Sequence, residues 1–406
     1  MLAACGGGGG SGHGSVAINF YNFPDASGAI QQGVTNCTKA SGGKYKINYI
    51  KLPTAADQQR QQLVRRMAAH DTSVDILGLD VTWEAEFSEA GWIEPWTGAM
   101  RQQIESNTVP GPLKTATWHG KLVAVPYNTN TQLLWYRDDL VPNPPKTWDQ
   151  MITMANHLAK QNKPHYIEEQ GAQYEGLTVW FNSMVAGAGG TILNSDSSKV
   201  TLGPPAVRAL QVMQRMATSK AADPSLSNNM EDQGRLAMEA GTAAFEINYP
   251  FVYPSMKADK PDLFKHFKWT LFPRVDPSES SHPTIGGIDM AISAYSKHKQ
   301  LAREAALCLR NRKNQIINAV VGGLPPTLTN IYTNPSKDFV KNYPFYKDIY
   351  TSLKQASVRP KTPAYQNVSI VISHTLSPPH NISPKQDVQT MKTQLQDALQ
   401  SKGLIP

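Results

Sequence analysis

The chain lacks the features that mark membrane-spanning and nucleic-acid-binding proteins. Its 406 residues contain no run of about 18 consecutive apolar residues, so no segment is expected to cross a membrane. Charged residues make up only 17%, and the net charge of +7 comes from lysines and arginines scattered among acidic residues. A nucleic-acid-binding protein gathers its basic residues on one stripe or patch. We therefore expect a globular protein that binds no nucleic acid.

The motifs of several large enzyme classes are also missing. The sequence has no phosphate-binding G-x-x-x-x-G-K-[ST], no H-E-x-x-H and no G-x-S-x-G. Its ten histidines show no metal-ligand spacing. We therefore expect no metal, no cofactor and no catalysis. Two alternatives remain, a glycoside hydrolase using carboxylates such as Asp80 and Glu231, and a non-catalytic adhesive surface lipoprotein.

Cysteine is rare, and the first of the three cysteines lies close to the start. Residues 2–5, Leu-Ala-Ala-Cys, resemble a bacterial lipobox, in which the cysteine becomes a lipidated N-terminus. The charged and apolar parts of a signal peptide do not precede Cys5, which we interpret as a truncated or engineered start. The glycine-rich residues 6–14 are typical of a flexible tether. We predict an extracytoplasmic protein held at the membrane only by a lipid on Cys5.

If Cys5 carries lipid, two cysteines remain in an oxidising compartment. Cys37 follows Ile30 and Val34 at helical spacing, and Cys308 lies in a second expected helix. We favour a disulfide between Cys37 and Cys308. The alternative is two separate thiols, each buried as a small apolar side chain.

Strands and helices alternate along the chain, which predicts an α/β fold with parallel sheets covered on both faces. The polar and aromatic residues that follow strand ends are candidate site residues, because ligands of such sheets lie beyond the carboxyl ends of the strands. These residues are Tyr21, Asn22, Asp80 and Trp83. The expected strands are 16–21, 46–52, 74–79, 132–137, 243–248 and 284–294, and the expected helices 29–41, 56–69, 148–161, 177–187, 208–218, 230–240, 301–311 and 386–400.

The proline-rich residues 254–281 are expected to form loops. We predict a tether at 1–14 and two lobes with a ligand cleft between them. The first lobe takes residues 15–127 with 285–325, and the second takes 128–284 with 326–406. The three hinge crossings are expected near 126–131, 281–286 and 323–327.

Segments spread from residue 16 to the C-terminus resemble the extracellular carbohydrate-binding proteins of ABC importers, which have the maltose-binding-protein-like fold. No single segment is decisive, but their order along the chain is. The segments are 90–96, 120–130, 134–140, 145–148, 244–248, 285–288 and 322–325. Two others, 79–87 and 358–366, most resemble the trehalose-binding lipoproteins of mycobacteria and related actinobacteria. The resemblance implies two lobes closing on a disaccharide, and it implies two permease subunits and a separate ATPase as partners.

The resemblance also implies the ligand contacts. Asp80, Asn130, Glu231 and Arg359 match sugar-binding positions of the trehalose-binding lipoproteins. Gly287 is a plausible backbone contact, because a missing side chain lets a ligand approach. Asn22 and Tyr127 are further candidates. Sugar hydroxyls pair with carboxylates and amides, while an aromatic ring covers a sugar face.

Each candidate also has a structural interpretation. Asp80 would cap the helix that starts near Trp83, and Asn130 would form a hinge turn. Glu231 would be a first-turn charge favoured by the helix dipole, and Arg359 a surface charge. The tryptophans Trp83, Trp92 and Trp96 are more often core anchors than ligand platforms.

Tyr249 departs from the pattern of the trehalose-binding lipoproteins, in which the matching position is tryptophan. It follows an expected strand end, where its ring would cover one face of the sugar. Tyrosine offers less area than tryptophan, and its hydroxyl needs a partner. The smaller ring leaves room for a bulkier sugar, and the alternative is that Tyr249 packs against its own lobe.

Overall fold

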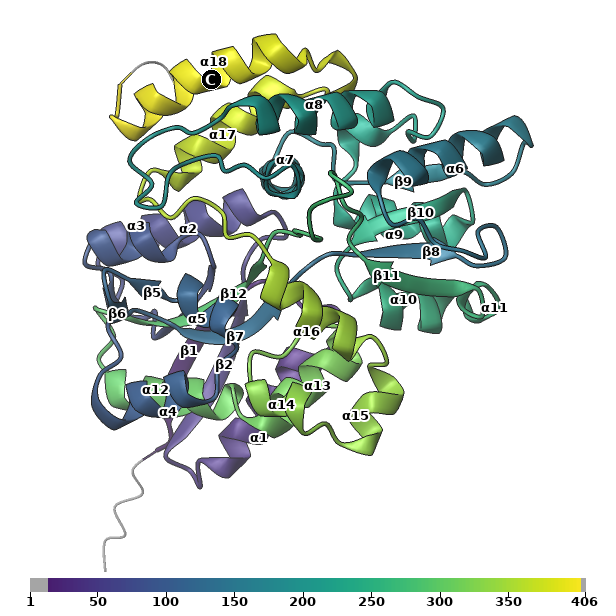
Figure 1. Cartoon of the computed structure of the whole chain (residues 1–406). Helices are drawn as coiled ribbons and strands as arrows, with labels where there is room; N and C mark the ends of the chain where they lie inside the picture. Colours follow the sequence, from purple (N-terminus) through teal and green to yellow (C-terminus); the bar gives the residue numbers. More distant parts are fainter. Residues whose placement is uncertain (1–13, 403–406) are drawn as a thin grey trace, which may run out of the picture.

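The computed structural model describes residues 14–402, and Figure 1 shows two α/β halves side by side. Cys5 and the tether lie outside the described residues, except for Gly14. The first half is built on a six-stranded sheet of order β2-β1-β3-β12-β4, with β7 also paired to β12. Its strands are β1 (Val16–Asn22), β2 (Tyr45–Lys51), β3 (Ile76–Asp80), β4 (Ile93–Glu94), β7 (Val125–Asn130) and β12 (Gly286–Ser293).

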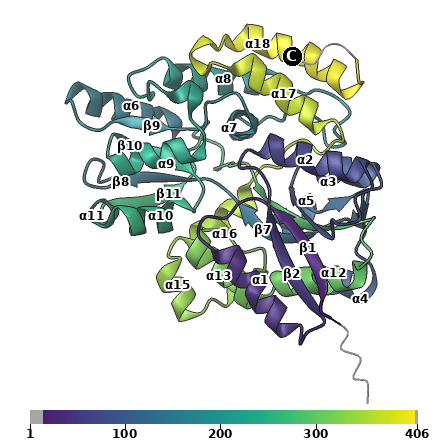
Figure 2. The same ribbon diagram turned by 180° about the vertical axis from the view of Figure 1, so that it is seen from behind.

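This first sheet is mixed, which corrects the expected parallel arrangement. Strands β1, β2 and β3 are parallel to one another, and Figure 2 shows β1 beside β2 from behind. Strand β12 returns from the distant part of the chain and runs antiparallel to β3, β4 and β7. The alternation of strands and helices says nothing about the direction of a strand that joins the sheet from a segment about 200 residues further along the chain. The antiparallel direction of β12 could therefore not be predicted from that alternation.

The second half is built on a four-stranded sheet of order β11-β8-β10-β9. Strand β10 is parallel to β9 and antiparallel to β8, and β11 is antiparallel to β8. The strands are β8 (Leu133–Arg137), β9 (Tyr166–Glu168), β10 (Ala243–Asn248) and β11 (Phe267–Leu271), while β5 (Thr117–Trp118) and β6 (Lys121–Leu122) form a separate ribbon.

Helices cover each sheet, and their apolar faces pack against the sheet to form the core of each half. Side chains of the first sheet are buried against Ile30, Leu63 and Phe87, one from each of the first three helices. The helices of this half are α1 (Ala29–Ala40), α2 (Ala56–Ala68), α3 (Glu84–Glu89), α4 (Gly98–Ser106), α5 (Pro110–Thr115), α12 (Lys299–Leu309) and α13 (Arg312–Gly322).

The second half places α7 (Glu175–Gly187) at its centre, and nearly all of its residues are buried. Helix α7 packs against α8 (Pro204–Ala217) and α17 (Tyr365–Leu376), and Figure 1 shows it end-on between them. The Thr147 hydroxyl accepts a hydrogen bond from the Gln150 N–H and so starts α6 (Trp148–Lys160). The remaining elements of this half are η1 (Leu226–Asn228), α9 (Glu231–Ala240), α10 (Val252–Asp259), α11 (Pro261–Phe264), η2 (Pro379–Asn381) and α18 (Pro384–Leu399).

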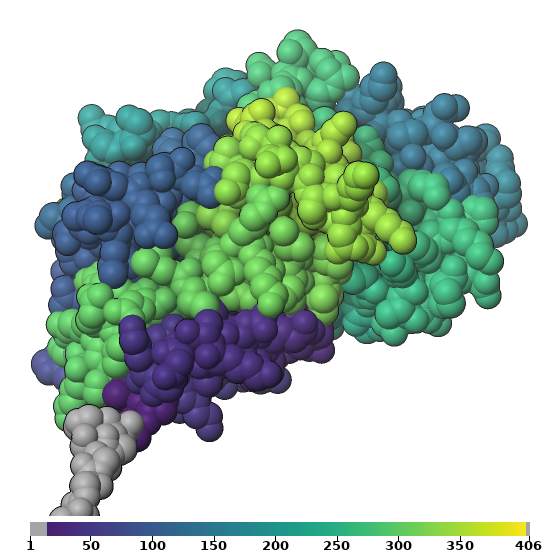
Figure 3. All heavy atoms as spheres, turned by 90° about the horizontal axis from the view of Figure 1, so that it is seen from below, coloured from purple at the N-terminus to yellow at the C-terminus, as the bar shows by residue number. Residues whose placement is uncertain are grey.

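A third apolar cluster joins the two halves. It holds α14 (Thr329–Thr333), α15 (Lys337–Asn342) and α16 (Tyr346–Gln355), which pack with Ala319 of α13 and with Trp135 and Phe267 of the second sheet. Figure 3 shows these helices, in green to yellow-green, between first-half residues in purple and blue and second-half residues in teal. The predicted division at residue 325 groups α14–α16 with α17 and α18, whereas in the structure they pack against both α13 and the second sheet. The lobe boundaries themselves stay a prediction.

The chain passes between the sheets at two of the expected places. It leaves the first sheet at Asn130 and enters the second at Leu133, and it returns between Leu271 and Gly286. A third crossing is the segment 356–364, which links α16 to α17 and runs beside the second crossing through a Thr284–Ser357 bridge. The expected crossing at 323–327 instead connects α13 to α14 along β7, where Pro325 accepts a hydrogen bond from the Thr129 N–H.

Residues 254–281 are not only loops, because α11, β11 and most of α10 lie there. Pro254 and Pro261 favoured a loop in the sequence, but both lie in the first turn of a helix. Proline costs no hydrogen bond there, because the first N–H groups of a helix have no partner within the helix. Among the described residues, no helix is both long and apolar enough to cross a membrane.

Candidate ligand-binding cleft

Asp80 ends β3 and faces the third crossing. Its Oδ1 accepts hydrogen bonds from the N–H and the hydroxyl of Thr82, at 3.1 and 2.8 Å. The same oxygen lies 3.1 Å from Nη2 of Arg359. Helix α3 begins after Trp83 without a side-chain cap, so the capping interpretation of Asp80 is wrong. The turn at Thr82 fixes the Asp80 carboxylate through Oδ1. The other oxygen of Asp80, Oδ2, is available to a ligand.

Arg359 is buried rather than a surface charge, with only 4% of the residue exposed. Its Nη1 lies 2.5 Å from Oε1 of Glu175, so the guanidinium is held between carboxylates of the two halves. Burial alone would lower the pKa of Arg359, but the charge of Asp80, followed by Tyr365 and Glu175, raises it well above its ordinary value. The guanidinium therefore stays charged inside the molecule.

Glu175 is the first residue of α7, and its own half surrounds it. Oε1 accepts the Tyr365 hydroxyl as well as Arg359, and Oε2 accepts the Ser369 hydroxyl. Burial raises the pKa of Glu175, while the charge of Arg359 opposes that rise. Sequence analysis passed over Glu175, because a glutamate in a first helical turn is common on solvated helices.

The second half contributes a group of carboxylates and aromatic rings at the same cleft. The Tyr174 hydroxyl lies beside the carboxylate of Glu231, the first residue of α9. Burial and then the charge of Glu231 raise the pKa of Tyr249, which also lies within the field of Arg359 and Asp80. Burial likewise raises the pKa of Glu169 well above its ordinary value, with Glu231 adding repulsion. The charges of Glu231, Arg359 and Asp80 thus all act on the Tyr249 hydroxyl.

The first crossing carries buried polar atoms that have no hydrogen-bond partner within residues 14–402. Such atoms cost about 1–3 kcal/mol each when they stay unpaired. Atoms of this kind occur elsewhere in the described residues too, but here four consecutive or nearly consecutive residues carry them. They are Asn128 Oδ1, Asn130 Oδ1, Thr131 Oγ1 and Gln132 Oε1, and two more lie nearby, Glu169 Oε2 and Arg359 Nε.

Asn130 lies close to Arg359 in the structure, as its choice as a candidate site residue led us to expect. It pairs with Gly286 across β7 and β12, and a Cβ added at Gly286 would lie 3.5 Å from Cβ of Asn130 and 4.0 Å from Nη2 of Arg359. The structure thus brings Asp80, Asn130 and Arg359 together from three separate segments.

Three other candidates lie in the framework around this group. Tyr127 is buried in the first core, edge-on to Phe20. Asn22 is fully buried over Gly78 of β3, where an added Cβ would lie 2.2 Å from its Oδ1. Gly287 has a φ of 135°, and an added Cβ would lie 2.3 Å from the Asn128 carbonyl oxygen, so strand packing already requires glycine there.

The tryptophans follow the structural interpretation. Trp83 and Trp96 are buried in the first core, and Trp92 packs edge-on against Phe87. Sequence analysis missed Glu169 and Tyr174 besides Glu175. A run of polar residues at the end of the β9 strand, Glu168–Gln170, was the available signal for Glu169.

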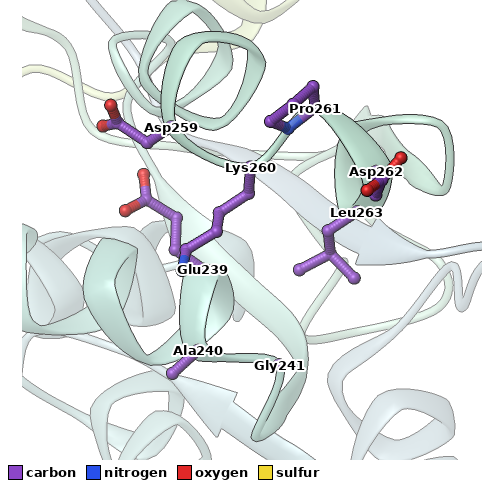
Figure 4. Close-up of a pocket in the computed structure, with 8 residues that line it drawn as sticks. All are labelled: Glu239, Ala240, Gly241, Asp259, Lys260, Pro261, Asp262 and Leu263. Carbon is purple, nitrogen blue, oxygen red and sulfur yellow. The ribbon is translucent and has the colours of Figure 1, made fainter.

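Two features outside the cleft do not compete with it. Figure 4 shows a surface hollow of about 520 Å³ on the second half, lined by Glu239, Asp259 and Leu263 among others. Ligand atoms of Asp138, Asp139 and His266 lie within 4.8 Å of one another. A cation there would compete with Arg137, which holds both oxygens of Asp139, and with Lys268.

Two sheets joined by three crossings, with the buried polar group of Asp80, Asn130 and Arg359 where they meet, define the chain as a two-lobed periplasmic-binding-protein-type fold. Residues 24–316 match the family model of the bacterial extracellular solute-binding proteins. The chain belongs to this family, whose members bind solutes and are not enzymes.

Relatives of known sequence or structure agree with this assignment. A probable ABC transporter-binding protein of Deinococcus radiodurans is 28% identical over 357 residues, 83% of each chain. Maltose-bound MalE3 of T. maritima is 25% identical with a TM-score of 0.86, covering 94% of this chain and 99% of that one. The GacH receptor of Streptomyces glaucescens, solved unliganded and with acarbose, is 20% identical with a TM-score of 0.83, covering 96% and 100%.

Proposed function

We propose that the chain is the substrate-binding subunit of an ABC sugar importer and that it captures a disaccharide, most specifically trehalose. The observation that supports this proposal is the proximity of Asp80, Asn130 and Arg359, with the charges of Asp80, Arg359 and Glu231 acting on Tyr249. These residues come from both sheets and from a crossing, so one ligand touching them all would link the two lobes.

The chemistry of the cleft suits a sugar. A pyranose presents hydroxyls around its edge and apolar C–H groups on its faces. Asp80 and Glu231 supply carboxylates, Asn130 an amide and Arg359 a charged donor, while the Tyr249 ring covers a sugar face. Polar atoms left unpaired by the protein gain partners from the ligand, which favours a hydroxyl-rich molecule over an apolar one.

Lobe closure couples this binding to transport. A sugar held between Asp80 on one side and Glu231 on the other favours the closed population by its differential affinity for that state. The closed protein delivers the sugar to the permease subunits, and a separate ATPase subunit drives release. A lipid on Cys5 would hold the protein at the outer face of the membrane and raise its concentration near the permease.

The solved relatives leave more than one sugar open. MalE3 is bound to maltose, GacH binds acarbose, and a solute-binding protein of Thermotoga lettingae holds α-D-tagatose. Maltose is therefore the second candidate ligand. The proposal of trehalose rests on the segments 79–87 and 358–366 and on the residues that they bring to the cleft.

Titration calorimetry of the purified chain with trehalose, maltose and sucrose tests this choice. We expect heat and saturation with trehalose, and weak or absent binding of the other two sugars. Tight binding of maltose with none of trehalose would contradict the proposed ligand and leave the sugar-binding role. Glucose release from trehalose, lost in Asp80→Ala or Glu231→Ala, would contradict the role itself.

A further inference from the structure

We propose that Glu175 is the positioning residue that holds Arg359 in its ligand-binding geometry. This inference rests on the proposed function, because it assigns a role in sugar binding to a residue that does not reach the sugar. Its basis is the set of hydrogen bonds that the Glu175 carboxylate accepts. They come from side chains of its own half and from the guanidinium of Arg359.

Glu175 is a fixed anchor. It starts α7, whose residues are almost all buried among α8, α17 and the second sheet. The Tyr365 hydroxyl and the Ser369 hydroxyl of α17 hold its two carboxylate oxygens. Only 12% of the Glu175 side chain is exposed. Both carboxylate oxygens therefore already accept hydrogen bonds, and the side chain is held against α17.

Arg359 needs such an anchor because it lies on a crossing and not on a helix or strand. A long side chain on a connecting segment has many rotamers, and fixing it costs up to about 2 kcal/mol of entropy. Glu175 takes Nη1 at 2.5 Å and Asp80 takes Nη2 at 3.1 Å, while Nε has no hydrogen-bond partner among the described residues.

Without Glu175, the guanidinium has one remaining carboxylate partner, Asp80. A planar guanidinium pairs best with a carboxylate through two parallel hydrogen bonds. Arg359 would turn to make that pair, and both groups would then be engaged with each other instead of with the sugar hydroxyls. The anchor on the second lobe thus keeps the two charged groups of the cleft available to ligand.

The test compares Glu175→Gln with a matched control, Glu239→Gln. Glu239 is also a buried glutamate of the second half in contact with one arginine, Arg235, at 2.9 and 3.0 Å, and it lines the outer hollow in Figure 4. We expect the affinity for trehalose to fall about tenfold or more in Glu175→Gln. It should stay unchanged in Glu239→Gln, although both variants melt earlier than the parent.

Ser369→Ala gives a milder variant that keeps the charge of Glu175. It removes one hydrogen bond from Oε2 and leaves the ion pair. We expect a loss of affinity of about twofold to fivefold, smaller than that of Glu175→Gln. Unchanged affinity in Glu175→Gln, with the parent binding sugar and Arg359→Ala losing it, would overturn the positioning role.

A second measurement reads the position of Arg359 without any sugar. Nitrogen-15 spectra resolve the side chain of a held arginine as separate Nη signals, and the Arg359 signals are assigned by their loss in Arg359→Lys. We expect the Arg359 signals to keep their positions in Glu239→Gln and to shift in Glu175→Gln, because the guanidinium turns toward Asp80. If the parent binds no sugar, the proposed function fails while this measurement still decides the role of Glu175. Arg359 signals at the parent's positions in Glu175→Gln would overturn the role.

Discussion

Nη2 of Arg359 and Oδ1 of Asp80 lie 3.1 Å apart, although 279 residues separate them in the chain. The pair links the first sheet to the last crossing, since Asp80 ends a strand of that sheet and Arg359 lies on the crossing. In a buried site this ion pair is held together by the surrounding low dielectric as well as by contact. Under the proposed function, a bound sugar competes with this pair for the same donor and acceptor atoms.

Arg359→Ala should abolish sugar binding and also lower the melting temperature of the ligand-free protein. The sequence alone favours a ligand-side arginine that contributes little to the fold. The structure reverses that expectation, because the substitution leaves the Glu175 carboxylate buried without its cation. Breaking a buried pair in this way costs about 3–5 kcal/mol. Calorimetric scanning of the ligand-free variant measures it, and an unchanged melting temperature would contradict the buried ion pair.

Tyr249→Ala should weaken sugar binding by about 1–3 kcal/mol, the scale of a lost aromatic contact. Tyr249→Trp should keep binding or strengthen it, since it restores a larger ring. Tyr253→Ala is the matched control, because Tyr253 packs against Phe264 and Phe345 away from the cleft. The control should lower stability and leave affinity intact. Equal affinity of the parent and Tyr249→Ala for every sugar bound would remove Tyr249 from the site.

The structure joins Cys37 of α1 to Cys308 of α12 in a disulfide, across a sequence separation of 271 residues. Closing so long a loop restricts the unfolded chain, so Cys37→Ala with Cys308→Ala should destabilise the protein by about 2–5 kcal/mol. Thiol titration checks the pairing in a Cys5→Ala background, where the denatured and unreduced chain should show no free thiol. Two reactive thiols would show that the cysteines are unpaired.

Stability should fall as the pH rises from about 5 toward 9. Burial raises the pKa of Glu168 to about 9 and that of Glu246 to about 8, against 4.5 for an ordinary glutamate. Over that range the folded chain holds protons that the unfolded chain has released, so raising the pH favours unfolding. Glu168→Gln and Glu246→Gln should each flatten the fall, measured as melting temperature against pH.

The control for this prediction is Glu279→Gln, a substitution of an exposed glutamate. It should leave the slope of melting temperature against pH unchanged. A parent whose melting temperature rises steadily between pH 5 and 9 would contradict the assignment of protons to the two buried carboxyl groups.

Local pattern predicted most of the fold, and tertiary contacts explain the exceptions. The helix over residues 29–41 and the strand over 16–21 lie within one residue of α1 and β1, because their apolar spacing matches their burial. The antiparallel direction of β12 was missed, since it depends on which strand edge the returning chain meets. Pro261 also misled, because proline is neutral at the first position of a helix and the sequence does not show which side of a helix start it lies on.

Some residues of the candidate site could likewise be predicted from the sequence, and others only from the structure. The sequence by itself determined Asp80, Asn130, Glu231, Tyr249 and Arg359 as candidates, because strand ends and the resemblance of segments such as 79–87 and 358–366 can be recognised without the fold. It gave no reason to choose Glu175. Only the tertiary structure decided that Arg359 is buried and that Glu175, 184 residues away, neutralises it. A buried charge must find its counter-charge wherever the packed chain brings one within reach, and that distance is a property of the fold and not of the sequence around either residue.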